Sequence, residues 1–450
     1  MKTWQLSDCD IEFVRRDPDL PGLATVLNPD AFVAALRRVL ARADLGTARI
    51  IYVTYRPRTS CLVHYQLDVA GTAVPIYATA WRLDAQAEFR TPRDQAPVPG
   101  PLGPGRVVLE DCAVGVSIFP NDRQVTGLPY FADAEARRHL LRALVPNDPD
   151  LWQSTVRSLA YRAEQRYVAQ LLSSDQERAA VKLYTAADYD AALAGPTALR
   201  SRGPLRLARL LGRCDGHRTL ALEWLPGRLL SEIIAGPDLD PEAAVAAGRA
   251  LAELHAQAPT GLPCWTREAE AASLCALATR LGWICPHLAA RADGLARRLA
   301  TRLRHEPPVN RPLHGDFHPK QVLLAGDSVA FLDLDRAVRG DPAADLGHFL
   351  AYLEHGVLRG KFAPPTVELL RDALLAGYRP ATEHITPARV DLYTAVELFR
   401  RVRYPFRHHE PDWPQRIEAI LERAEAIAHR ALARAYTTPR GRDLRRTQEN

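Results

Sequence analysis

An approximate internal repeat of roughly 105 residues is the feature that most restricts how this 450-residue chain can fold. Gly22-Leu23 recurs as Gly127-Leu128, and Tyr55-Arg56 recurs as Tyr161-Arg162, at offsets of 105 and 106 residues. In each copy a helix-like run of apolar residues is followed by strand-like runs. The repeat therefore predicts two related units, each made of a helix and then an antiparallel set of strands.

The same elements are expected in the same order in both copies. In the first copy we predict a helix over residues 31–42 and strands over residues 50–55, 61–69 and 74–81. In the second copy we predict a helix over residues 134–144, a strand around residues 161–162, and strands over residues 167–172 and 179–184. We interpret the first copy, from about Asp17 to Trp81, as a degenerate version of the second that packs on it as a cap.

One strand of the second copy carries a lysine that the first copy lacks. Residues 180–184 read AVKLY, with Lys182 at their centre, whereas residues 76–81 read IYATAW, with Thr79 near the equivalent place. Lysine is scarce, because only four of the 58 basic residues are lysines. A lysine in an apolar strand of such a chain indicates a specific chemical requirement, such as a bound phosphate, which only the second copy meets.

The rest of the chain changes from strand-like to helical at Pro226-Gly227. Strand-like runs are expected over residues 205–211 and 219–225, a strand–loop–strand unit over 313–334, and mostly helix over 343–436. Helices are predicted over residues 241–257, with Asp240 as the N-cap, and over 268–281 and 287–303. We therefore expect an N-terminal α+β cap (1–120), a small β-rich lobe (121–225) and a larger helical lobe (226–450).

Composition excludes several classes of protein. The apolar content of 47% and the charged content of 25% are those of an ordinary globular protein, and the net charge of +5 gives little support to nucleic-acid binding. The seven cysteines are odd in number and form no C-x-x-C pair, so free thiols are expected. The first residues lack the apolar core of a signal peptide, and no stretch of about 18 apolar residues occurs. These features favour a cytoplasmic protein that does not contact membranes.

The stretch LHGDFHPKQVLLAGDSVAFLDLDRAVRGDPAADL, residues 313–346, carries the chemistry. Asp316 lies in a tight glycine-containing loop, and Gln321 follows it just before an apolar strand. A hairpin then returns the chain to Asp333 and Asp335, which would share one face if the strand continued that far. Phosphoryl transfer requires a carboxylate beside the attacking hydroxyl, oxygen ligands for Mg²⁺ and a cation on the phosphates. The loop and the hairpin together predict the carboxylate beside the hydroxyl and the oxygen ligands for Mg²⁺.

These motifs resemble the catalytic loop and metal-binding motif of the aminoglycoside phosphotransferase/choline kinase superfamily, from about Trp152 to the C-terminal helices. The resemblance implies an α+β, bilobal, protein-kinase-like fold and a small-molecule kinase that uses ATP and Mg²⁺. Its acceptor would be a hydroxyl of a sugar, an amino sugar, an aminoglycoside or an amino alcohol. The residues implied are Asp316 as the catalytic aspartate, Gln321 and Asp333 as Mg²⁺ ligands, Asp345 as a support of the loop, Lys182 on the nucleotide phosphates, and Glu223, Trp224 and Leu225 as the hinge against adenine.

The sequence departs from the commonest family pattern in three ways. Gln321 stands where asparagine is usual, a variant that resembles bacterial maltokinase-like proteins, which also carry an N-terminal cap. Residues 173–177 contain no glycine, so no glycine-rich phosphate loop is visible. No obvious helix glutamate pairs with Lys182, and Asp188 and Asp190 are the nearest acids. The alternative reading is a catalytically silent nucleotide-binding or regulatory protein of the same fold.

Several roles stay open in the sequence. Lys320 is either a contact of the transferred phosphate or a solvated loop lysine, and Asp335 is either a second metal contact or an ion-pair partner of Arg336 or Arg339. His318 is interpreted as structural, and His408-His409-Glu410 as a solvated helix end and not as a metal site. The acceptor is expected to lie against the C-terminal helices, and the oligomeric state is left open. Candidate acceptor contacts are Tyr352, Glu354, Glu397 and Trp413.

Overall fold

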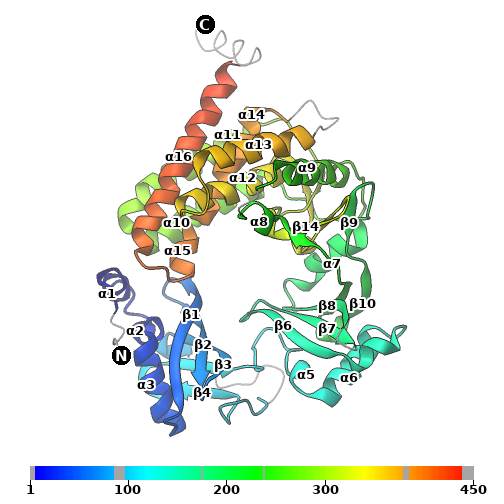
Figure 1. Cartoon of the computed structure of the whole chain (residues 1–450). Helices are drawn as coiled ribbons and strands as arrows, with labels where there is room; N and C mark the ends of the chain where they lie inside the picture. Colours follow the sequence, from blue (N-terminus) through cyan, green and yellow to red (C-terminus); the bar gives the residue numbers. More distant parts are fainter. Residues whose placement is uncertain (1–5, 86–96, 174–175, 237–238, 379–384, 438–450) are drawn as a thin grey trace. The chain divides into compact units, whose positions relative to one another are not determined.

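The computed structural model describes residues 6–85, 97–173, 176–236, 239–378 and 385–437 (Figure 1). The chain folds into two compact units. The first comprises Met1–Tyr189, Leu210–Glu223 and Tyr404–Pro414, and the second comprises Asp190–Arg209, Trp224–Arg403 and Gln415–Asn450. The expected cap and small lobe therefore belong to one compact unit, together with a short segment from the C-terminal region.

The N-terminal part of the first unit is a five-stranded antiparallel sheet in the order β1-β2-β3-β5-β4. Its strands are β1 (Leu45–Arg56), β2 (Ser60–Val69), β3 (Thr72–Trp81), β4 (Arg106–Leu109) and β5 (Val114–Ile118). Three helices precede them, α1 (Asp8–Arg15), α2 (Leu23–Leu27) and α3 (Pro29–Leu40). The side chain of Asn28 accepts hydrogen bonds from the backbone N–H groups of Asp30 and Ala31, which fixes the start of α3.

The second sheet of this unit is also antiparallel, in the order β6-β7-β8-β11-β10. Its strands are β6 (Thr155–Arg162), β7 (Arg166–Ser173), β8 (Gln176–Tyr184), β10 (Leu210–Cys214) and β11 (Thr219–Glu223). The helices α5 (Pro129–Ala132) and α6 (Ala134–Leu144) share a buried apolar core with it. The prediction of one strand over 205–211 is wrong: the chain breaks there into β9 (Leu205–Leu207) and β10, which belong to different sheets.

The two sheets have the same strand order, as the sequence repeat predicts. Thr79 pairs with Leu62 in the first sheet, and Lys182 pairs with Val168 at the equivalent place in the second. The last two strands of each sheet are joined by a 3₁₀ turn that ends on a left-handed residue, Ala113 in one sheet and Arg218 in the other.

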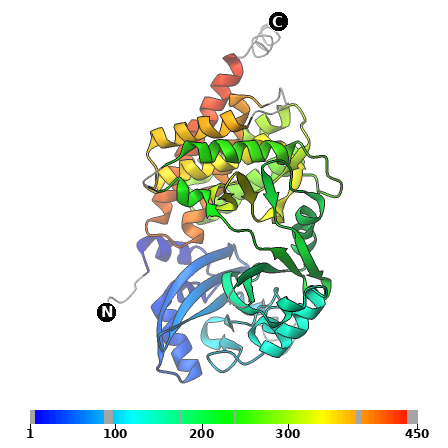
Figure 2. The same ribbon diagram turned by 45° about the vertical axis from the view of Figure 1, so that its right-hand side comes forward.

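The second unit is mainly helical. Its long helices are α9 (Pro241–His255), α10 (Arg267–Ile284), α11 (Ala289–His305), α12 (Ala343–Leu358), α13 (Pro364–Gly377), α14 (Pro387–Arg400) and α16 (Trp413–Thr437), which begins within the first unit. Shorter helices are α7 (Tyr189–Ala198), α8 (Leu230–Ile233) and α15 (Tyr404–Arg407), of which α15 belongs to the first unit. Figure 2 shows α9 (green) beside α13 (yellow to orange), and α12 packs against α14.

The second unit also contains two small sheets made of short strands. A four-stranded sheet has the order β12-β14-β15-β9, in which β9 and β15 run parallel. Its strands besides β9 are β12 (Arg228–Leu229), β14 (Val322–Ala325) and β15 (Ser328–Phe331), and a separate pair is formed by β13 (Arg311–Leu313) and β16 (Val338–Gly340). The hairpin expected within 313–334 is therefore present. Within the described residues, no helix has the length and apolarity needed to cross a membrane.

Candidate functional site

The loop after β13 is held in an unusual backbone conformation. Gly315 has φ of +78°, in the left-handed region that favours glycine. A β-carbon at this position would overlap the carbonyl oxygen of Arg336, so the close approach of two backbone segments also excludes a side chain. The local geometry thus requires a glycine at position 315, directly before Asp316.

Asp345, at the start of α12, supports this loop as expected from the sequence. Its carboxylate accepts hydrogen bonds from the backbone N–H groups of His314 at 2.7 Å and Gly315 at 2.9 Å. His255, at the end of α9, contacts the same carboxylate through Nε2 at 3.0 Å. Burial alone would raise the pKa of Asp345, but the hydrogen bonds from His255 and the loop outweigh it and lower the pKa. Asp345 therefore acts as an ionised anchor of the loop.

The buried ring of His314 adds a second restraint. Its Nε2 lies 2.8 Å from the carbonyl oxygen of Leu332 and donates to it, and its Nδ1 accepts from the backbone N–H of Asp316 at 3.3 Å. These contacts assign the donor role to Nε2 and the acceptor role to Nδ1. His314 thus ties the loop to the end of the β14–β15 hairpin.

The hairpin brings Gln321 and Asp333 together, as predicted. Nε2 of Gln321 donates to Oδ2 of Asp333 at 3.3 Å, and the backbone N–H of Leu332 donates to the carbonyl oxygen of Gln321 at 2.8 Å. The expectation that Asp333 and Asp335 share a strand face is wrong. The strand ends at Phe331, Asp333 is left-handed with φ of +61°, and Asp335 lies in a 3₁₀ turn over Leu334–Arg336.

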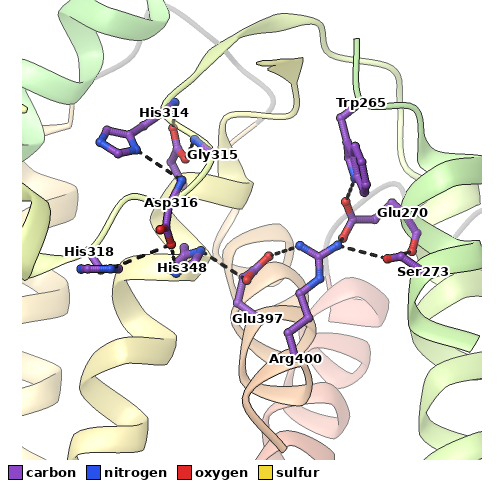
Figure 3. Close-up of polar contacts among 11 residues, drawn as sticks. Trp265, Glu270, Ser273, His314, Gly315, Asp316, His318, His348, Glu397 and Arg400 are labelled. Atoms are coloured by element: carbon purple, nitrogen blue, oxygen red, sulfur yellow. Dashed lines mark hydrogen bonds and ion pairs between the residues drawn. The ribbon is translucent and has the colours of Figure 1, made fainter. Parts of the chain in front are cut away.

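Asp316 is surrounded by histidines (Figure 3). Its Oδ1 lies 3.1 Å from Nε2 of His348 on α12 and 3.9 Å from Nε2 of His318. The other ring nitrogen of His348, Nδ1, lies 3.3 Å from Oε2 of Glu397 on α14. Burial alone would raise the pKa of the Asp316 carboxyl, but the hydrogen bond and charge of His348 outweigh it and hold the pKa well below its usual range.

The His318 ring belongs to a different arrangement from that of His348. Burial lowers the pKa of His318 to about 3, so the ring is neutral. Its Nδ1 accepts from the backbone N–H of Lys320 at 3.2 Å, which leaves the ring proton on Nε2, facing Asp316. The ring of Tyr352 stacks on His318 with a centroid distance of 5.5 Å and an interplanar angle of 15°. His318 thus faces the carboxylate as well as capping the short turn after it.

The sequence of the chain also matches a known family. The sequence model of the phosphotransferase enzyme family, APH, matches residues 153–393, just over half of the chain.

The chain belongs to this phosphotransferase family.

Solved structures similar to this phosphotransferase have low sequence identity to it. A choline kinase from Cryptosporidium parvum Iowa II is 11% identical, with 69% of this chain and 99% of that chain covered and a TM-score of 0.48. A choline/ethanolamine kinase family protein from Mesorhizobium loti is 16% identical, with 68% and 96% covered and a TM-score of 0.43. A mutant of aminoglycoside phosphotransferase APH(4)-Ia, in a complex with ADP and hygromycin B, is 13% identical, with 65% and 97% covered and a TM-score of 0.46. A comparison with curated protein sequences gives no match.

The other expected site residues of the phosphotransferase lie in the β-rich unit or at its border. Lys182 is buried on β8, where its backbone pairs with Val168 and Leu220. Glu223 ends β11 within the first unit, whereas Trp224 and Leu225 begin the next segment of the second unit. Lys182 and Glu223 therefore belong to a different unit from Asp316, Gln321 and Asp333, whereas Trp224 and Leu225 belong to the same unit as these three. Residues 174–175 of the glycine-free loop lie outside the described residues.

The residues at Gln321 and Asp333 fit a Mg²⁺ ion by their chemistry. Mg²⁺ prefers oxygen ligands, and a carboxylate beside a side-chain amide supplies them. The amide nitrogen of Gln321 faces Asp333 in this structure, and half a turn of the amide presents its oxygen instead. These two residues would hold the ion in the phosphotransferase.

Two of the expected acceptor contacts are engaged elsewhere. Trp413 is buried in the first unit, packed against Phe406 at 5.1 Å between ring centroids, and its Nε1 donates to Asp10 at 3.1 Å. Glu354 forms a two-pronged ion pair with Arg423 at 2.8 and 3.0 Å. Trp413 is thus part of a buried core, and both oxygens of the Glu354 carboxylate are bonded to Arg423.

The contact between Asp316 and His348 was not foreseen from the sequence. His348 stands three residues after Asp345, one helical turn along α12, so that both face the loop. This spacing is a signal that sequence reasoning can use once the role of Asp345 is recognised. Glu397 carries no such signal, because it reaches His348 only through the packing of α14 against α12.

Proposed function

We propose that the chain is an ATP- and Mg²⁺-dependent phosphotransferase that moves the γ-phosphoryl group of ATP to a hydroxyl of a small molecule. One observation supports this best: Asp316 stands on a loop fixed by Asp345 and His314, and the loop leads directly to the paired Gln321 and Asp333. A carboxylate held beside a magnesium-type ligand pair suits phosphoryl transfer, and the chain belongs to a phosphotransferase family.

The proposed reaction assigns one task to each residue. Asp316 orients the acceptor hydroxyl and accepts its proton as the acceptor oxygen bonds to the γ-phosphorus, while the bond from that phosphorus to the β-phosphate oxygen breaks and ADP leaves. Gln321 and Asp333 hold Mg²⁺, which neutralises charge on the phosphates when bound. Lys182 contributes a cation to the α- and β-phosphates, and residues 223–225 contact adenine.

Of the acceptor classes that the sequence leaves open, we propose a neutral polyhydroxylated molecule, such as a sugar. The guanidinium of Arg401 lies 5.9 Å from the centre of the Tyr352 ring, beside His318. Burial lowers the pKa of Lys320, on the loop after Asp316, and so do the positive charges of Lys361 and Arg359 near it. The charges of Arg401, Lys361 and Arg359 disfavour a polycationic aminoglycoside near Asp316. Aromatic and histidine faces suit the apolar faces and hydroxyl groups of a sugar.

We further propose that the N-terminal sheet is a degenerate copy of the small lobe and binds no nucleotide. Equivalent hydrogen bonds support this. Tyr55 donates to Asp17 at 2.7 Å, and Tyr161 donates to Asp122 at 2.8 Å. The same two carboxylates accept from the backbone N–H groups of Arg58 and Glu164, which have φ of 55° and 56°. The two copies also contact each other, because the hydroxyl of Tyr52 donates to the carbonyl oxygen of Ala163 at 2.8 Å.

ATP consumption measured across sugars, amino sugars, aminoglycosides and amino alcohols tests the proposed reaction. We expect turnover with a neutral sugar, and a loss of about 10²–10⁴-fold in Asp316→Asn and Asp333→Ala with the fold intact. Lys182→Ala is expected to raise the KM for ATP more than that for the acceptor. Normal turnover in Asp316→Asn would refute the site. Absence of turnover with every acceptor, together with retained ATP binding, would favour the silent alternative.

A further inference from the structure

We infer that His348, held by Glu397, is a positioning residue for Asp316. The inference rests on the proposed function, in which Asp316 receives the acceptor hydroxyl. Nε2 of His348 lies 3.1 Å from Oδ1 of Asp316, and Nδ1 lies 3.3 Å from Oε2 of Glu397. Figure 3 shows the three side chains in a row that starts at the loop and ends on α14.

A carboxylate at each ring nitrogen determines what the imidazole of His348 can do. A neutral imidazole donates from one nitrogen only, whereas an imidazolium donates from both. Each ring nitrogen of His348 faces a carboxylate oxygen, so a proton on either nitrogen has an acid as its hydrogen-bond partner. Glu397 therefore sets the orientation of the ring, in the way that a carboxylate orients a histidine in other active sites.

The consequence for Asp316 is that its two oxygens become different. Oδ1 faces the N–H of His348 at 3.1 Å and the Nε2 of His318 at 3.9 Å. The acceptor hydroxyl then has Oδ2 as its partner, in a direction fixed by the hydrogen bond on the other oxygen. Correct orientation of reacting groups accounts for a large part of enzymatic rate acceleration, so a carboxylate free to rotate would act more slowly.

Glu397 is itself held in place. Nη1 of Arg400 donates to its Oε1 at 2.8 Å, and Nη2 of Arg400 contacts Glu270 on α10 at 2.5 Å. Trp265 donates to the other oxygen of Glu270. Glu397 is thus fixed on its other side by Arg400, which Glu270 contacts in turn.

The same residues admit a different reading, in which Asp316, His318 and His348 hold a metal ion, since their ligand atoms lie within 4.8 Å of one another. The hydrogen bond from Lys320 to Nδ1 of His318 argues against it, because the ring proton is then on Nε2, the atom that faces the cluster. A histidine ligates through an unprotonated nitrogen. The positioning role fits the observed contacts without moving a proton.

Kinetics with a matched control test the inference. Glu397→Gln is compared with Glu354→Gln, because both glutamates are buried, each is paired with an arginine at 2.8 Å, and Glu354 lies on α12 with its carboxylate away from His348. We expect Glu397→Gln and His348→Leu to lower kcat about 10- to 100-fold with the KM for ATP within about twofold, and Glu354→Gln to change neither. His348→Gln, which keeps an N–H donor, should recover part of the loss. Wild-type kcat in both Glu397→Gln and His348→Leu overturns the inference, whereas the proposed function still stands on Asp316→Asn.

A second measurement does not depend on turnover. In protein labelled with ¹⁵N in its histidines, NMR reports whether each ring nitrogen of His348 carries a proton, with His348→Gln identifying its signals. We expect Glu397→Gln to change the Nδ1 signal of His348, whereas Glu354→Gln leaves it unaltered. A His348 ring whose signals ignore Glu397→Gln overturns the inference. Zn²⁺ bound at one equivalent and lost in His348→Gln would favour the metal reading and also overturn it.

Discussion

At the scale of single residues, the geometry of the loop depends on Gly315. Its positive φ and its contact with the backbone of Arg336 impose two separate restrictions. A side chain there strains the backbone, and it also pushes the loop away from the segment that carries Asp335. Because Asp316 follows immediately, the displacement is passed directly to the carboxylate.

We therefore predict that Gly315→Ala lowers kcat by at least about 100-fold, since displacement of a reacting group by about 1 Å has an effect of this order. Gly360→Ala is the control, because Gly360 has φ of +68° and no atom within 4 Å of an added β-carbon. It is expected to lose about 1 kcal/mol of stability and no activity. Steady-state kinetics and thermal unfolding of both variants check this, and a Gly315→Ala enzyme with near-normal kcat would show that the loop tolerates the shift.

Another residue-scale prediction concerns pH and His64 on β2. The ring is buried between Tyr52 and Tyr161, and burial lowers its pKa to about 4. Neither ring nitrogen has a hydrogen-bond partner among the residues that the structure describes. In the folded protein this ring therefore binds a proton only at a lower pH than in the unfolded chain, where a histidine has its ordinary pKa of about 6.5. The buried neutral ring therefore does not reduce the stability of the fold above about pH 6.5, and stability is lost as the pH falls from about 6.5 towards 4, because only the unfolded chain then binds the proton.

Accordingly, the wild-type protein should lose about 2 kcal/mol from this group between pH 7.5 and pH 5, and His64→Phe should not. Phenylalanine keeps the ring between the tyrosines and removes two polar atoms that lack partners. Urea unfolding at the two pH values measures the difference. An equal acid sensitivity in His64→Phe would mean that other groups cause the loss.

At the scale of elements, the two sheets hold their preceding segment in the same way. A β-carbon on Gly22 would overlap Val114 and the carbonyl oxygen of Cys112, and one on Gly127 would lie 3.0 Å from the carbonyl oxygen of His217. Both glycines thus allow the chain before a helix to approach the 3₁₀ turn of its own sheet. The first copy is the tighter of the two.

This difference predicts that Gly22→Ala destabilises the protein by about 2–3 kcal/mol and Gly127→Ala by about 1 kcal/mol. The backbone of Gly22, with φ of −82°, accommodates alanine, so the cost comes from packing. Chemical denaturation of the two variants provides the comparison. If Gly127→Ala proved the more harmful, the two sheets would differ more in packing than their shared strand order indicates.

At the scale of the whole molecule, the N-terminal part is built into the first unit. Phe13 of α1 packs against Phe406 of α15 at 4.9 Å and near Trp413 at 6.4 Å between ring centroids. In a second contact, the ring centroids of His64 on β2 and Tyr161 on β6 lie 5.1 Å apart. Both contacts join residues 1–120 to distant parts of the chain.

Removal of residues 1–120 should therefore destabilise what remains by more than the loss of one buried ring, which costs about 3–5 kcal/mol. We expect a lower Tm and faster proteolysis of the chain beginning at residue 121. Phe13→Ala in the full chain isolates one contact and should have a smaller effect. An unchanged Tm after the deletion would show that the remaining lobes fold independently of the cap.

Local patterns in the sequence were sufficient for much of this description. The apolar spacing of α6 and the Asp240 cap of α9 are properties of short segments, and the structure has both where they were expected. The shared strand order of the two sheets agrees with the repeat in the sequence, because similar apolar patterns bury equivalent faces. The hairpin that joins Gln321 to Asp333 is likewise local, since a Gly-Asp turn brings neighbouring strands together.

Contacts between segments far apart in the chain were decided only by the tertiary structure. Residues 205–211 were expected to form one strand, yet they split between β9 and β10, because sheet membership depends on partners elsewhere. Trp413 enters the core of the first unit since α15 and Asp10 meet there. His348 and Glu397 stand 49 residues apart and come within 3.3 Å through the packing of two helices, a result that no periodicity within either helix specifies.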